Sequence, residues 1–230
     1  MDSYRKIAII VGVLFITATV TSILSSVFLG NTLAVPLSLN AVYLNTNNVL
    51  IAVILELIAA LSAFGTAVML FPILKTYFEG LAMAYVGLRL FENAFYILGV
   101  ICLLVLLTLS QQYVTVINAS YQPLSNLMLA LYDWSLAVGT VIIFGIGSLT
   151  LNYTLYRSKL VPRWISLWGL IGAVLVILYG LIGIFTLNPN MISSILTLLA
   201  IPIAIQEMVF AVWLIVKGFN LSLNCTRSVK

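Results

Sequence analysis

Four residues within one apolar stretch carry groups that could bind a ligand or hold helices together: Tyr85, Arg89, Glu92 and Tyr96. At about 100° per residue on a helix, all four lie on one narrow face. A guanidinium and a carboxylate one turn apart are costly to place in hydrocarbon, so each must find a partner inside the protein. This face is the first candidate for a polar centre, either ligand-binding or structural.

Two further glutamates, Glu56 and Glu207, interrupt apolar stretches elsewhere in the chain. Each shares a helical face with alanines, whose small side chains let neighbouring helices approach closely. These alanines are Ala60, Ala63 and Ala67 beside Glu56, and Ala200, Ala204 and Ala211 beside Glu207. We expect both glutamates to face the interior, and we predict a bidentate ion pair between Arg89 and Glu207, which lie at similar depth.

The apolar stretches hold more acids than bases, with three glutamates and Asp133 set against Arg89 alone. At least one carboxyl group must therefore be protonated, paired with a cation or exposed to a water-filled cavity. Two interpretations stay open. In one, the centre responds to protons or cations or receives the positive group of a ligand. In the other, it is a structural Arg–Glu pair that fixes how the helices pack.

The elements that position these residues follow from the composition, which is 63% hydrophobic and only 7% charged. A soluble domain carries about 25% charged residues, so this chain is expected in a membrane. It contains no His, which excludes imidazole metal sites and Ser–His or Cys–His nucleophiles. Cys102 and Cys225 cannot form a metal site by themselves, and no cofactor is expected.

Six apolar stretches are long enough to cross a hydrocarbon core of about 30 Å, which takes about 20 helical residues. They are residues 7–29, 49–73, 83–109, 129–153, 165–186 and 195–216. We therefore predict an all-α, polytopic membrane helical bundle of six transmembrane helices, with residues 1–230 in a single transmembrane domain. Pro202 lies inside the last stretch and is expected to kink that helix.

The basic residues predict the orientation of this bundle. Of the ten Lys and Arg residues, all except Arg89 lie outside the six stretches, and with six spans they fall on one side of the membrane. The connections on the other side, residues 30–48, 110–128 and 187–194, carry no charge. This asymmetry predicts a multi-pass protein of the cell (plasma) membrane with a cytoplasmic N-terminus and a cytoplasmic C-terminus.

Two sequence segments also carry a resemblance to a known family. The first reads Arg-Ser-x-Leu-x-Pro-Arg-Trp over residues 157–164, and the second reads Trp-Leu-x-x-Lys-Gly-Phe-Asn over residues 213–220. Together with the segment from Arg89 to Glu92 and with Glu207, they resemble the domain-of-unknown-function family 4386 of uncharacterised prokaryotic multi-pass membrane proteins. The resemblance covers nearly the whole chain and implies a six-span membrane protein. It implies no activity and no catalytic residues.

Three classes of function remain open. The first is binding or transport of a small or lipid-like molecule at the intramembrane Arg/Glu centre. The second is an accessory or assembly subunit of a membrane complex, whose buried charges are purely structural. The third, and least favoured, is an intramembrane enzyme using glutamate acid/base chemistry.

The expected partners depend on which of these classes holds. The lipid bilayer is common to all of them, a small-molecule or lipid ligand belongs to the first class, and other membrane subunits belong to the second. No nucleic-acid partner is expected, because membrane orientation explains the net charge of +4.

Overall fold

The computed structural model describes residues 3–115, 121–187 and 199–220, and every regular element within these ranges is a helix. In chain order they are α1 (Ser3–Leu29), α2 (Leu39–Leu44), α3 (Thr46–Leu74), α4 (Glu79–Thr115), α5 (Tyr121–Ser135), the π-helix η1 (Leu136–Ile143), α6 (Phe144–Ser158), α7 (Arg163–Phe185) and α8 (Ile201–Val216). Because α5, η1 and α6 are continuous, the described residues contain five helices long and apolar enough to cross a membrane. The all-α prediction is confirmed, and the five apolar helices suggest a multi-pass membrane protein, while the count of six spans stays a prediction.

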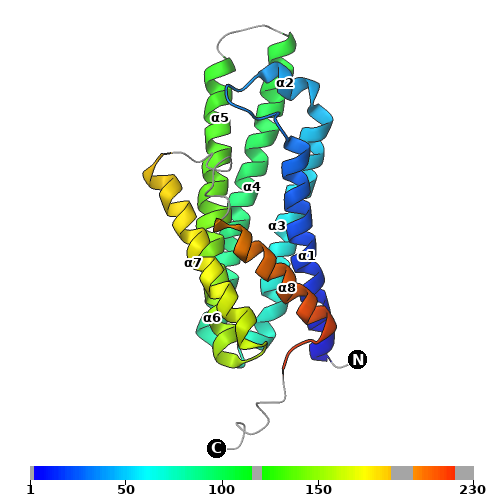
Figure 1. Ribbon diagram of the computed structural model, residues 1–230. Coiled ribbons are helices and arrows are strands. Elements are labelled where there is room, and N and C mark those ends of the chain that lie inside the picture. Colours follow the sequence, from blue (N-terminus) through cyan, green and yellow to red (C-terminus); the bar gives the residue numbers. More distant parts are fainter. Residues whose placement is uncertain (1–2, 116–120, 188–198, 221–230) are drawn as a thin grey trace, which may run out of the picture.

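The long helices form a bundle in which each packs on the next (Figure 1). α1 packs on α3, α3 on α4, and α4 on the continuous α5–η1–α6 helix. α7 then packs on α6 and η1, and α8 packs on α7 and returns to α1. The half of the bundle near the N-terminus is therefore a closed ring of helices. The other half consists of α1, α3, α4 and α5, with the short α2 against α4 (Figure 1).

Several helices extend further than the apolar stretches predict. α4 has 37 residues and continues to Thr115, while α5 already begins at Tyr121, so most of the predicted connection 110–128 is helical. Hydropathy marks where a helix lies in hydrocarbon and does not mark where its hydrogen bonding ends. At 1.5 Å per residue, α4 is about 56 Å long and exceeds a hydrocarbon core of about 30 Å.

The last predicted stretch differs most from the structure. Residues 195–198 lie outside the described part of the chain, and the helix that follows, α8, has 16 residues. Pro202 does not kink this helix, because it lies in the first turn of α8. A proline is well tolerated there, since the N–H groups of the first turn have no partner within the helix. The expected kink at Pro202 is therefore wrong.

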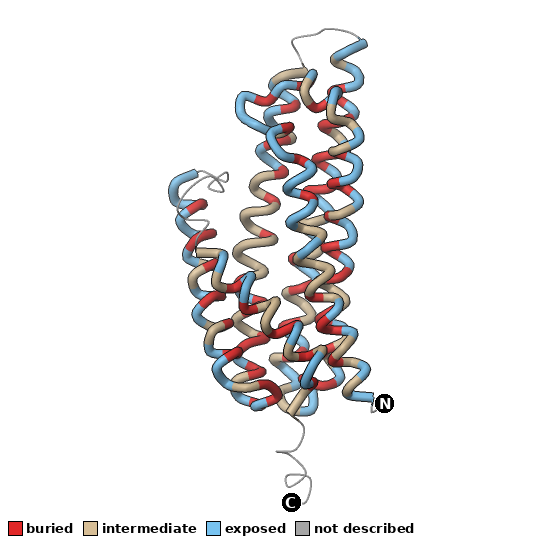
Figure 2. Tube along the Cα trace, turned by 45° about the vertical axis from the view of Figure 1, so that its right-hand side comes forward, coloured by how far each residue is buried: buried red, intermediate tan, exposed pale blue. Residues whose placement is uncertain are grey.

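Buried residues lie along the inward sides of the helices and exposed residues along the outside (Figure 2). The core near the N-terminus joins α1, α3, α4, α6 and α8, and it includes Phe15, Leu70, Tyr85 and Phe210. A second core, around Leu103 of α4, joins α3, α4 and α5 at the opposite end. Many large apolar side chains remain exposed, as hydrocarbon requires of the outer surface.

The two ends of the described chain lie at the same end of the bundle and are bonded to it (Figure 1). The Arg5 guanidinium at the start of α1 donates hydrogen bonds to the carbonyl oxygens of Leu214, Ile215 and Val216, where α8 ends. The N–H of Asn220 donates to the carbonyl of Leu160 at 2.8 Å. These contacts fix the start of α1, the end of α8 and the α6–α7 connection to one another.

Candidate functional site

The face of α4 that carries Tyr85, Arg89 and Glu92 points into the ring of helices. All three side chains are buried, and Arg89 is only 3% exposed although it carries a full charge. Its Nε donates to the Tyr85 hydroxyl at 3.1 Å, and that hydroxyl lies 3.4 Å from Oγ1 of Thr66 on α3. The one-turn spacing along α4 thus lets a tyrosine and a glutamate hold the same guanidinium.

Arg89 joins two glutamates from different helices. Its Nη1 lies 2.9 and 3.1 Å from the two carboxylate oxygens of Glu92, and its Nη2 lies 3.6 Å from Oε1 of Glu207 on α8. The Arg89–Glu207 pair predicted from depth is therefore present, but it is not bidentate. The two short contacts of Arg89 Nη1 go to Glu92, because the two residues are three positions apart on the same helix and their side chains are therefore neighbours. Glu207 is the more open of the two acids, at 14% exposure against 5% for Glu92.

Aromatic rings surround the rest of the guanidinium. Its central carbon lies 5.3 Å from the ring centroid of Phe144, 5.5 Å from that of Tyr85 and 5.9 Å from that of Phe15. The Phe15 ring packs edge-on against Phe210 of α8 at 5.4 Å. Ring faces attract cations, so these contacts add to the two carboxylates in stabilising a buried positive charge.

A cavity of about 300 Å³ lies against this cluster. Arg89, Glu92 and Glu207 line one part of it, together with Tyr96. The rest of the wall is apolar or weakly polar and comes from Phe15, Ala18, Thr19, Ser22, Ile23, Ala59, Ala63, Thr66, Thr140, Val141, Phe144, Val176, Ala200, Ile203 and Ala204. We call it the Arg89 cavity. It combines a charged wall with apolar walls, which is the usual character of a small-molecule site.

Glu56 lies apart from this cluster, on α3. Its side chain is 4% exposed, and its Oε1 accepts hydrogen bonds from the Tyr132 hydroxyl at 2.7 Å and from Oγ of Ser25 at 3.2 Å. It lines a second cavity of about 190 Å³, which also contains Asp133. We call this the Glu56 cavity. The structure thus divides the predicted polar residues between two cavities, of which Tyr96 lines both, while the buried Tyr85 lines neither.

Other polar residues of the interior were not singled out from the sequence. Gln206 donates to Oδ1 of Asn152 and to the carbonyl of Ile165, at 3.2 Å in each case, and so joins α8 to α6 and α7. Both amide side chains are almost fully buried. An uncharged amide in an apolar stretch is a weaker signal than a charge, but it carries the same requirement for partners.

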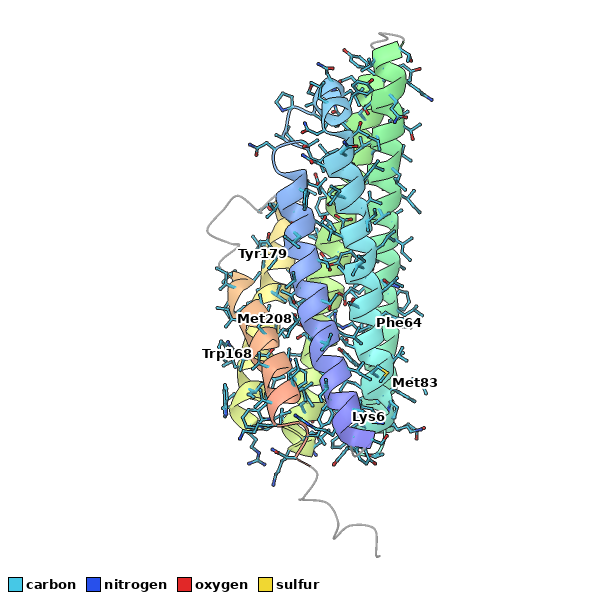
Figure 3. All side chains as sticks on the ribbon, turned by 90° about the vertical axis from the view of Figure 1, so that its right-hand side faces the viewer. Lys6, Phe64, Met83, Trp168, Tyr179 and Met208 are labelled. Atoms are coloured by element: carbon cyan, nitrogen blue, oxygen red, sulfur yellow. The ribbon has the colours of Figure 1, made fainter. Side chains whose placement is uncertain are left out.

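The residues that line these cavities come from α1, α3, α4, the continuous α5–η1–α6 helix, α7 and α8, and Figure 3 shows the described side chains on the ribbon. In that view Tyr179 of α7 and Met208 of α8 lie on one side of α1, while Phe64 of α3 and Met83 of α4 lie on the other. The cavities therefore receive residues from helices that are far apart in sequence. Within the described ranges, no three Cys, Asp or Glu side chains converge as a metal site would require.

The sequence of the chain matches one known protein family over most of its length. Residues 10–218 match the family described as a domain of unknown function, DUF4386. The chain belongs to the DUF4386 family. The resemblance seen in its sequence segments is thereby confirmed, and the match includes Arg89, Glu92 and Glu207 within its range.

For this DUF4386 protein, no curated protein and no solved structure gives a match. The family description assigns no activity. The cavities and charged side chains of the protein itself are therefore the guide to its function.

Proposed function

We propose that this DUF4386 protein binds a small or lipid-like molecule that carries a positive group, and that it moves this molecule across the membrane. One observation carries the proposal: the Arg89 cavity, of about 300 Å³, has Arg89, Glu92 and Glu207 in its wall. Ligand cavities in proteins usually measure about 300–1,000 Å³, so this one is large enough for a small ligand.

The charges in the wall indicate the sign of the ligand. Arg89 already has contacts to Glu92 and Glu207 and to three rings, so little of its charge is left to attract an anion. Glu207 has only one contact to Arg89, at 3.6 Å, and is partly open. A positive group beside Glu207 would complete its partners, and the apolar walls would cover the uncharged body of the ligand.

The two cavities also support movement of the ligand. They share Ser22, Tyr96, Thr140 and Val141 in their walls, so they are neighbours along the bundle. The hydroxyl groups among these shared residues lie between Glu207 and Glu56, so a charged group that passes from one acid to the other keeps polar neighbours.

The proposal includes six spans, with both termini on the cytoplasmic side of the plasma membrane. In support, α8 runs back to the end of the bundle where α1 begins, and the basic residues gather at that end.

The proposal is tested with octylamine, which combines an apolar body with one positive group. The protein is purified in a maltoside detergent, and thermal unfolding is followed with octylamine and, separately, with the uncharged octanol. Octylamine should raise the unfolding temperature and octanol should not. Glu207→Gln should abolish the rise while leaving a folded protein.

Glu79→Gln is the matched control, because Glu79 is an exposed glutamate in the first turn of α4, outside both cavities. It should keep the response to octylamine. An equal response to octanol, or an unchanged response in Glu207→Gln, would contradict the proposal.

A second candidate is an accessory subunit whose buried charges only hold helices together. It is favoured by the complete set of internal partners around Arg89, since a guanidinium so enclosed needs no ligand. This candidate predicts that a larger membrane protein co-purifies in mild detergent. A protein that purifies alone and responds to octylamine would exclude it.

A further inference from the structure

Two acids, Glu56 and Asp133, line the Glu56 cavity. No Lys or Arg is among the described residues that line it. At about 190 Å³ it falls below the usual size of a whole ligand site, and it has room for roughly six water molecules or one compact head group.

One oxygen of Glu56 has no partner in this cavity. Tyr132 and Ser25 both donate to Oε1, while the buried Oε2 receives no hydrogen bond. A buried carboxylate oxygen without a donor is costly, because it gives up its hydration without replacement. The two donors already hold the carboxylate in place, so Oε2 is left as the counter-charge for a cation that enters the cavity.

Three tyrosines share the wall with the acids: Tyr96, Tyr132 and Tyr179. Several aromatic rings beside carboxylates form the environment that binds ammonium groups, since each ring face attracts a cation. The wall also carries the hydroxyl groups of Ser22, Ser26 and Thr140, but these are weaker ligands for a bare metal ion than carboxylate and carbonyl oxygens, whereas the three rings suit an organic cation. The chemistry of the wall thus favours an organic cation.

The π-helix η1 gives this cavity its shape. Leu136, Ala137, Thr140 and Val141 all come from it and line the wall. A π-helix is wider than an α-helix and rare as a structure, and short π segments in other proteins are frequent at functional sites. The presence of this rare helix type in the wall supports a binding role for the cavity.

We propose that the Glu56 cavity binds a small quaternary ammonium group, with Glu56 Oε2 as its counter-charge and with Tyr96, Tyr132 and Tyr179 in the same wall. The inference rests on the proposed function in one respect: a ligand whose positive group first lies beside Glu207 passes Tyr96 and reaches Glu56 as its second site. The ammonium site itself stands on the geometry of Glu56.

Choline is the probe, and 3,3-dimethylbutanol, which has the same shape without the charge, is its control. Binding is measured by thermal unfolding of the purified protein in a choline-free maltoside detergent, at ionic strength held constant with sodium chloride. Choline should raise the unfolding temperature in a saturable way, and the neutral analogue should not. Glu56→Gln should weaken the apparent affinity by about tenfold or more, as expected for loss of a charged partner.

A second variant keeps the test decisive if Glu56→Gln does not fold. Ala137 lines the Glu56 cavity but not the Arg89 cavity, so Ala137→Leu fills the first with apolar bulk and leaves Glu56 in place. It should abolish the choline response. Equal stabilisation by sodium chloride or by the neutral analogue would overturn the inference. So would an unchanged choline affinity in a folded Glu56→Gln variant, or a choline response that survives in a folded Ala137→Leu variant.

The two proposals fail in different ways. Loss of the octylamine response only in Glu207→Gln, with no response to choline, would leave the proposed function and remove the ammonium site. A choline response that depends on Glu56, with no response to octylamine, would do the reverse.

Discussion

Arg89→Met should lower the free energy of unfolding by about 3–5 kcal/mol, the usual cost of removing one partner of a buried ion pair. The structure gives the reason for so large a value. The substitution leaves Glu92, now 5% exposed, without the Nη1 group that contacts both of its oxygens. It also removes the 3.6 Å contact to Glu207 and the hydrogen bond to Tyr85.

The double variant Arg89→Met/Glu92→Met should be more stable than Arg89→Met alone. Replacing both partners by apolar side chains of similar size removes the unpaired buried charge, and such replacements are often neutral or stabilising. Glu207 would remain, but it lines a cavity and is partly open. We therefore expect at least about 2 kcal/mol of coupling between the two substitutions, within the range for residues in contact.

Reversible unfolding by sodium dodecyl sulfate in mixed maltoside micelles measures these free energies. Lys75→Met is the control for loss of a positive charge, because Lys75 is exposed at the end of α3. A change of less than about 1 kcal/mol in Arg89→Met, or a double variant no more stable than Arg89→Met, would show that the Arg89–Glu92 pair does not stabilise the fold in this way.

Three further predictions concern packing and orientation. Gly139→Ala should destabilise the protein by about 1–3 kcal/mol in the same assay, since its Cβ would lie 2.2 Å from Cβ of Phe95. Gly87→Ala, whose Cβ would meet nothing within 4 Å, should not destabilise it. Arg5→Gln should speed hydrogen exchange in the last turn of α8, where Arg5 bonds the carbonyls, and Lys6→Gln should not. Orientation is tested with single cysteines in a chain without the native cysteines. Lys6→Cys should be protected from an impermeant maleimide in intact cells, whereas Asn40→Cys, at an exposed position of α2, should react.

The sequence predicts helices and their inward faces well, because both depend on local periodicity. The face of Tyr85, Arg89 and Glu92 follows from the helical repeat, and the structure buries all three. The meeting of Arg89 with Glu207 follows from depth in the membrane, which counting residues from each helix end can estimate. These inferences need no knowledge of how one helix is rotated against another.

Contacts that depend on such rotation were not predictable. Tyr132 donates to Glu56 from 76 residues further along the chain, and no local pattern links the two. The bidentate pairing expected for Arg89 and Glu207 was wrong for the same reason, since a difference of about an ångström in helix packing decides it. The π-helix was also missed, because it arises from tertiary packing and not from a sequence signal in residues 136–143.

The two acidic sites differ in how much of their negative charge the chain itself balances. Around Arg89 the protein supplies its own cation, and that cation joins α4 to α8 across the ring. Around Glu56 it supplies two hydroxyl donors and no cation. A charge needed only for packing would be expected to have its partner in the chain, as Arg89 has. The acid whose second oxygen has no partner is therefore where a positive group from outside the chain has most to contribute.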